Sequence, residues 1–101
     1  MALRGKGRDR VTAALAHHRP FRAQGNAMSA IEGKGGTGRL EGTHLERYRS
    51  DNVTYTVYSY ATPIAWVANG GLVRVPDVSY SVTTSHHQTL CRVYLAGKGE
   101  R

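Results

Sequence analysis

The sequence predicts an α+β domain in which a small four-stranded, mainly antiparallel sheet packs on one face against a single C-terminal helix. Residues 53–83 form short runs of alternating apolar and polar side chains, separated by Pro and Gly. Residues 84–97 change to the three- and four-residue spacing of a helix. Residues 1–50 are basic, rich in glycine and poor in bulky apolar side chains. We therefore expect a disordered or loosely structured leader over 1–50, a domain over 51–97 and a tail over 98–101.

Four strands are expected in the domain: Val53–Tyr60, Ile64–Ala68, Leu72–Val75 and Val78–Thr83. The first and the last alternate strictly, which is typical of a strand that is buried on one side. Pro63 separates the first two strands because it has no backbone donor and is tolerated only at an edge, a bulge or a strand start.

The dipeptide Asn69-Gly70 predicts a two-residue type I′ hairpin, since both central residues of that turn need a positive φ. In this register Trp66 faces Val73 on an apolar side of the sheet. A loop of three residues would instead bring Trp66 opposite Arg74, and the apolar pattern disfavours it. The expected face under the helix consists of Tyr55, Val57, Ile64, Trp66, Val73, Val75, Tyr80 and Val82.

The helix is expected to begin at Thr84 or Ser85, because Ser85 and Gln88 have the spacing of a capping box. Thr84, Ser85, His87 and Gln88 therefore form a helix cap, and the free amides there can also bind an anion such as phosphate. Capping alone explains these residue types and is favoured. The apolar stripe that packs on the sheet is Leu90, Val93 and Tyr94, and Gly97 suits the C′ position.

The chain has 101 residues, a formal net charge of +7 and a pI near 10.1, which favours acidic or polyanionic partners. Cys91 is the single cysteine, so the chain forms no intramolecular disulfide. A small domain without disulfides is expected in the cytoplasm rather than outside the cell. No apolar run approaches the ~20 residues that span a bilayer, so no membrane partner is expected.

Within the leader, residues 25–42 are rich in glycine and are expected to be a linker. The string KGGTGR at 34–39 resembles the phosphate loop of the partition-type ATPases. Arg39, however, stands where the phosphate-binding lysine belongs, and Leu40 where the magnesium-binding hydroxyl belongs. Translation from Met28 rather than Met1 stays open as an alternative.

Two stretches of the expected domain carry a wider resemblance: Ser59–Trp66, SYATPIAW, and Pro76–Gln88, PDVSYSVTTSHHQ. They resemble a family of short, uncharacterised proteins of actinobacterial phages, which show a SYxTPIAW stretch, a turn, and a PDVxYSxTTSxHQ stretch. The resemblance implies a phage origin and a location in the cytoplasm of the host cell, and the family has no assigned activity. The leader has no counterpart in it.

His87 and Cys91 are four residues apart on the expected helix and could supply two metal ligands, or a thiol and its base. Two ligands are too few for a metal site, and a thiol beyond the first turn gains little from the helix N-terminus. We therefore expect no metal, no cofactor and no enzymatic activity.

The expected function is that of a small phage-encoded accessory protein that acts by binding, first of all to a host protein. The alternative is a nucleic-acid-binding protein that uses the basic leader and the open sheet face with Tyr58, Tyr60 and Arg74, aided by Arg47 and Arg49. A structural or assembly role is a further alternative, and a homo-oligomer would suit so small a domain.

Overall fold

The structure is a computed structural model that describes residues 2–23, 27–76 and 87–95. Its elements are α1 (Ala2–His17), β1 (Phe21–Ala23), β2 (Met28–Glu32), α2 (Gly42–Ser50), β3 (Val53–Ser59), β4 (Thr62–Ala68) and β5 (Leu72–Arg74), followed by a helix over 87–95. The strands form one antiparallel sheet in the order β1-β2-β3-β4-β5. None of the described helices is long and apolar enough to cross a membrane.

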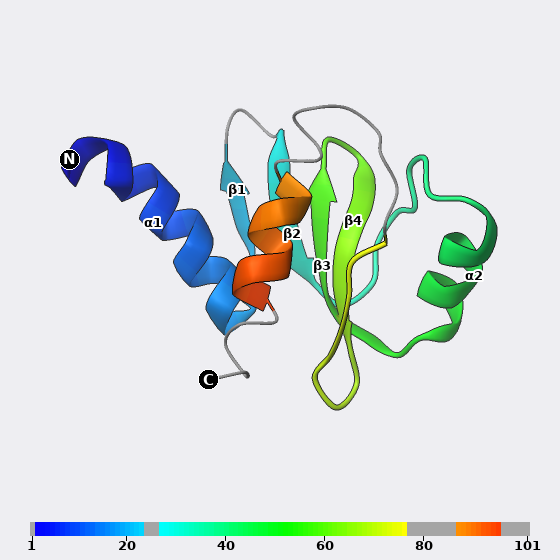
Figure 1. Ribbon diagram of the computed structural model, residues 1–101. Coiled ribbons are helices and arrows are strands. Elements are labelled where there is room, and N and C mark those ends of the chain that lie inside the picture. Colours follow the sequence, from blue (N-terminus) through cyan, green and yellow to red (C-terminus); the bar gives the residue numbers. More distant parts are fainter. Residues whose placement is uncertain (1, 24–26, 77–86, 96–101) are drawn as a thin grey trace.

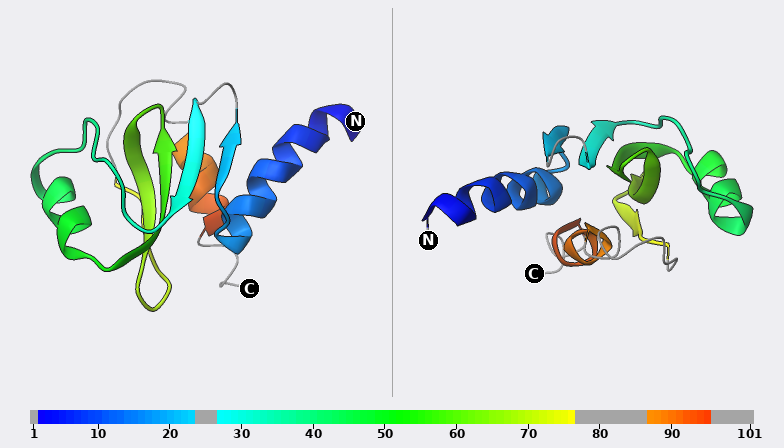
Figure 2. Two further views of the ribbon diagram at one scale, coloured as in Figure 1. Left: turned by 180° about the vertical axis from the view of Figure 1, so that it is seen from behind. Right: turned by 90° about the horizontal axis from the view of Figure 1, so that it is seen from above.

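The α+β class is confirmed, but the described residues hold five strands and three helices where four strands and one helix were predicted. The predicted strand Val78–Thr83 lies outside the described residues. Figures 1 and 2 show α1 and helix 87–95 on one side of the sheet and α2 on the other. We call the first side the core face and the second the loop face.

Apolar side chains fill the core face. Antiparallel pairing places Tyr55 opposite Val67, and Val57 opposite Ala65. The buried members of this cluster are Val11, Leu15, Met28, Ala30, Tyr55, Val57, Ile64, Ala65, Val67, Leu90, Cys91 and Leu95. Helix 87–95 packs through Leu90 as predicted, but Val93 is exposed and Cys91 and Leu95 take the inward positions. α1 and helix 87–95 therefore enclose the core together.

The predicted loose leader is wrong for most of its length. β1 and β2 extend the sheet, with Met28 paired to Ser59, and Val11 and Leu15 of α1 are buried in the core. The composition is misleading because a few apolar residues at the right spacing suffice: Val11, Ala14 and Leu15 share one side of α1.

α1 ends in a Schellman motif. His18 takes a φ of 54°, its amide bonds to the Leu15 carbonyl at 3.2 Å, and the Arg19 amide bonds to the Ala14 carbonyl at 2.8 Å. Pro20 follows, which cannot continue the helix. Tyr55 of β3 fixes this end to the sheet, since its hydroxyl donates to the Arg19 carbonyl at 2.7 Å and its ring stacks on His18. The direction in which α1 leaves the sheet is therefore set by the core.

The hairpin between β4 and β5 has the three-residue loop that the sequence disfavours. Ala68 pairs with Leu72 and Trp66 with Arg74, while Gly70 and Gly71 take φ values of 85° and 83°. Trp66 consequently lies on the loop face and not against helix 87–95, where it was predicted. It is fully buried there with Leu40 and Tyr48.

Candidate functional site

A pocket of about 350 Å³ lies between α2 and β5, at the β5 edge of the sheet. Its apolar wall consists of Trp66, Val73, Val75 and Pro76. Its polar wall consists of Thr43, His44, Arg47 and Arg74. The volume falls in the range of pockets that bind small groups, about 300–1,000 Å³.

Asp51, the residue that follows α2, holds two residues of this pocket in place. Its Oδ2 accepts a hydrogen bond from Trp66 Nε1 at 2.9 Å and an ion-paired hydrogen bond from Arg74 Nε at 2.7 Å. Burial raises the pKa of Asp51, but the bonds from Trp66 and Arg74 and the charges of Arg74 and Arg47 outweigh it. The pKa therefore lies below its ordinary value, and Asp51 is ionised at neutral pH. This anchor explains why the sheet places Trp66 opposite Arg74.

α2 is fixed over the sheet by Tyr48, its one fully buried side chain. The Tyr48 ring meets the Trp66 ring edge to face, with centroids 4.9 Å apart. Its hydroxyl accepts a bond from the Gly35 amide at 2.8 Å and pairs with Thr56 Oγ1 at 2.9 Å. Because Tyr48 points inward, Arg47 beside it lies at the rim where α2 faces β5.

The glycine-rich loop 33–41 packs against the same face and supports α2. Thr56 Oγ1 donates to the Gly33 carbonyl and Tyr58 Oη to the Gly36 carbonyl, each at 2.8 Å. Burial is the main cause that raises the pKa of Tyr58, whose hydroxyl stays protonated as a donor. The Arg39 amide bonds to Thr62 Oγ1 at 2.9 Å. A flexible linker was predicted here. The conformational entropy lost on ordering this loop is offset by its hydrogen bonds to the sheet.

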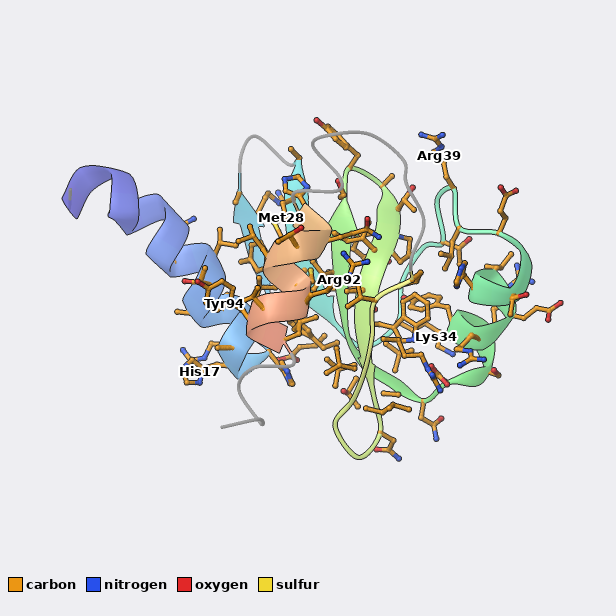
Figure 3. The ribbon with its side chains drawn as sticks, viewed as in Figure 1. His17, Met28, Lys34, Arg39, Arg92 and Tyr94 are labelled. Carbon is orange, nitrogen blue, oxygen red and sulfur yellow. The ribbon has the colours of Figure 1, made fainter. Side chains whose placement is uncertain are left out.

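The loop does not have the arrangement of a phosphate loop. Lys34 Nζ donates at 2.8 Å to the Arg49 carbonyl near the end of α2 and lies 5.9 Å from the centre of the Tyr48 ring. Figure 3 shows Lys34 lying toward α2 and Arg39 pointing away from the body. The amides of Gly35 and Arg39 already bond to hydroxyls of the sheet and of α2.

The residues predicted to bind nucleic acid are only partly brought together. Arg47 and Arg74 line one pocket, and Arg49 is exposed on the same helix. Tyr58 is 8% exposed under the loop, whereas Tyr60 is 61% exposed in the turn after β3. The face predicted to be open is therefore covered by α2 and the loop, and the two tyrosines do not form a shared stacking surface.

The predicted helix cap is only partly described, since Thr84 and Ser85 lie outside the described residues. His87 is buried, with its Nδ1 2.9 Å from Ser59 Oγ. Gln88 is also buried, and its Nε2 donates to the Pro76 carbonyl at 2.9 Å. Both side chains therefore join helix 87–95 to the strands.

Cys91 is buried one turn after His87, and burial raises the pKa of its thiol to about 12. The thiol is protonated at neutral pH, unlike an activated nucleophile. Within residues 2–23, 27–76 and 87–95, no group of three or more His, Cys, Asp or Glu side chains is placed to hold a metal ion.

Sequence reasoning missed His44, Trp66 and Asp51 as parts of a site. His44 lies in the segment 1–50 that was predicted to be loose. Asp51 is the first residue of the predicted domain, but the pairing of Trp66 with Arg74 becomes favourable only through it. The signal that could have found the site is an acidic residue just before a strand whose partner hairpin presents both Trp and Arg.

The profile of a family of unknown function, DUF8033, matches residues 18–95. The chain belongs to this family. The DUF8033 match spans β1 through helix 87–95 and so includes the whole pocket, whereas α1 precedes it. No curated protein and no solved structure matches the chain.

Proposed function

We propose that this DUF8033 protein is a binding protein that takes an acidic segment of a partner protein into the pocket between α2 and β5. The observation that carries the proposal is the meeting of two arginines, Arg47 and Arg74, beside the indole of Trp66 in one pocket. Arginine is among the side chains most enriched at the energetic centres of protein interfaces.

The two walls favour a ligand with both acidic and apolar groups. Asp51 engages the Nε of Arg74, so the terminal nitrogens of the guanidinium can donate to an incoming carboxylate. Arg47 is exposed and can turn toward the same group. An aliphatic side chain next to that carboxylate would pack on the partly exposed Val73 and Val75.

Preorganisation supports a binding role. Asp51 fixes the side chains of Trp66 and Arg74 before any ligand arrives. The Arg74 side chain is still 27% exposed. Tyr48 and the loop 33–41 fix α2. A pocket built from held side chains loses little conformational entropy on binding.

The SYATPIAW and PDVSYSVTTSHHQ stretches bear on where the protein acts. Their resemblance to phage proteins supports an accessory role in the cytoplasm of an infected cell. The partner would then be an acidic host protein.

The test uses the fluorescence of Trp66, the single tryptophan of the chain. Short extended peptides that combine Leu and Glu side chains are titrated, together with versions in which Gln replaces Glu or Ser replaces Leu. We expect a change in Trp66 emission only with peptides that carry both groups. Arg47→Gln should weaken that binding roughly tenfold or more, the worth of one charge-assisted hydrogen bond.

The matched control is Arg49→Gln, which removes an exposed arginine from the same helix but outside the pocket. Its affinity should equal that of the parent. Equal binding of Glu and Gln peptides, or an equal loss in the Arg47 and Arg49 variants, would show that the pocket does not recognise a carboxylate.

A further inference from the structure

A second pocket lies at the opposite edge of the sheet, between the C-terminal half of α1 and β1. It has a volume of about 510 Å³, and its charged or titratable lining is entirely basic. Arg10 and His17 come from α1, Arg19 from the following turn and Arg22 from β1, and all four are exposed. This is a concentration of positive charge that the proposed peptide pocket does not use.

α1 continues outward from this pocket. Figures 1 and 2 show the N-terminal half of α1 projecting beyond the sheet, with only its C-terminal half lying against the body. The sequence of the N-terminal half, residues 2–9, is ALRGKGRD, with three Lys or Arg residues, one Asp and a single bulky apolar residue. Such a sequence offers few apolar side chains for packing on the rest of the fold, and its two glycines weaken the helix. A polyanion that neutralises the positive charge would therefore stabilise the helix.

The C-terminal end of α1 is fixed to the sheet. The Schellman motif and the bond from the Tyr55 hydroxyl to the Arg19 carbonyl fix the direction of the helix and the place of Arg19 and Arg22 beside it. Arg10 reaches across the pocket, where its Nη2 lies 3.5 Å from the Arg22 carbonyl. The basic side chains of helix and strand are thus held in one surface.

We propose that this surface binds the phosphate backbone of double-stranded DNA, with the projecting half of α1 in the major groove. An α-helix with side chains is about 10–12 Å across and the major groove is about 12 Å wide, so the helix fits. Arg10, Arg19 and Arg22 contact phosphates at the base of the helix. The positive end of the helix dipole lies at the projecting end, which also favours a polyanion.

The inference is independent of the proposed peptide binding. β1 and β5 are opposite edges of the sheet, so the two sites do not overlap. α1 precedes the DUF8033 match, and DNA binding would therefore be a property of this chain added to whatever the family shares.

The test is fluorescence anisotropy with a labelled duplex of about 20 base pairs and mixed sequence, measured at several salt concentrations. Full-length protein should bind with an affinity that falls steeply as salt rises. Arg10→Gln with Arg22→Gln should lower the slope of log affinity against log salt by roughly 2, because each lost phosphate contact removes about 0.9. Circular dichroism and Trp66 emission of the variant should match the parent, which shows that the fold is kept.

The charge-matched control is Arg39→Gln with Arg49→Gln, two exposed arginines outside this pocket. Its slope should stay at the parent value. Equal effects of the two double variants would show that binding depends only on the net charge of the protein, which would overturn the proposal. Equal affinity for poly-glutamate or for a single strand would also overturn it, as would the absence of duplex binding at low salt.

Discussion

The core face and the loop face of the same sheet are covered by different means. On the core face, α1 and helix 87–95 bury a continuous apolar cluster. On the loop face, the buried apolar cluster of the described residues is small, comprising Leu40, Tyr48 and Trp66, and hydroxyls of Tyr48, Thr56 and Tyr58 bond to the loop backbone. Apolar burial has no direction, whereas a hydrogen bond fixes one geometry. The cover of the loop face is consequently held in place by directional bonds more than by apolar burial.

The largest expected effect comes from removing half of the cover of the core face. A chain that begins at Met28 lacks α1 and β1, so it loses Val11 and Leu15 from the core. We expect no cooperative thermal unfolding, because a domain this small has little stability to spare. Circular dichroism during heating measures it.

The control for this truncation removes residues 1–9 and keeps the part of α1 that holds Val11, Ala14 and Leu15. It should unfold cooperatively near the parent midpoint. A cooperative transition in the Met28 chain would mean that β2 to helix 87–95 form a sufficient core without α1.

The next effect probes the small cluster of the loop face. Trp66→Ala removes the fully buried indole, the ring that packs on Tyr48 and one of the two hydrogen bonds that Asp51 accepts. The expected loss is about 3–5 kcal/mol of unfolding free energy, measured by urea denaturation. Leu72→Ala on β5, where the side chain is half exposed, should change it by less than about 0.5 kcal/mol. A small loss for Trp66→Ala would show that the loop face adds little to stability.

A smaller effect tests how closely the loop 33–41 approaches the turn after β3. Gly38 has a φ of 48°, and a Cβ there would collide with the Ala61 carbonyl. Gly38→Ala should therefore cost roughly 1–3 kcal/mol, the usual range for a strained backbone position. At Gly36 a Cβ meets open space and φ lies outside the left-handed region, so Gly36→Ala should be neutral or slightly stabilising. Equal effects would contradict the close approach of the loop to the turn after β3.

The smallest expected effect is a pH dependence at the anchor of the pocket. The pKa of Asp51 is lowered in the folded state, so its contribution to stability is present above the unfolded pKa and is lost as the pH falls through the folded pKa. Between neutral pH and the acid limit, the parent should lose more stability than Asp51→Asn. Parallel curves for the two proteins would mean that the bonds from Trp66 and Arg74 do not depend on the charge of Asp51.

The same contrast between the faces explains what the sequence could predict. β3 follows from alternation, which also predicts that Tyr55 and Val57 pack in the core. β4 follows from the apolar run between Pro63 and the turn at Asn69-Gly70. The site does not, because it depends on contacts distant in sequence. Asn69-Gly70 favours a two-residue turn locally, but the hydrogen bonds that Asp51 accepts favour the register that pairs Trp66 with Arg74. The loop 33–41 was also missed, since hydroxyl bonds to a backbone have no periodicity.

The strand order of the sheet also bears on how the chain folds during its synthesis. Each of the strands that the structure describes pairs with its neighbour in sequence, so a pairing can form as soon as the next strand has been made. The core face is the exception, because Leu90, Cys91 and Leu95 arrive last. Until helix 87–95 is made, Val57 and Val67 lack part of their cover, and the nascent chain exposes an apolar strip that aggregation or a chaperone can reach.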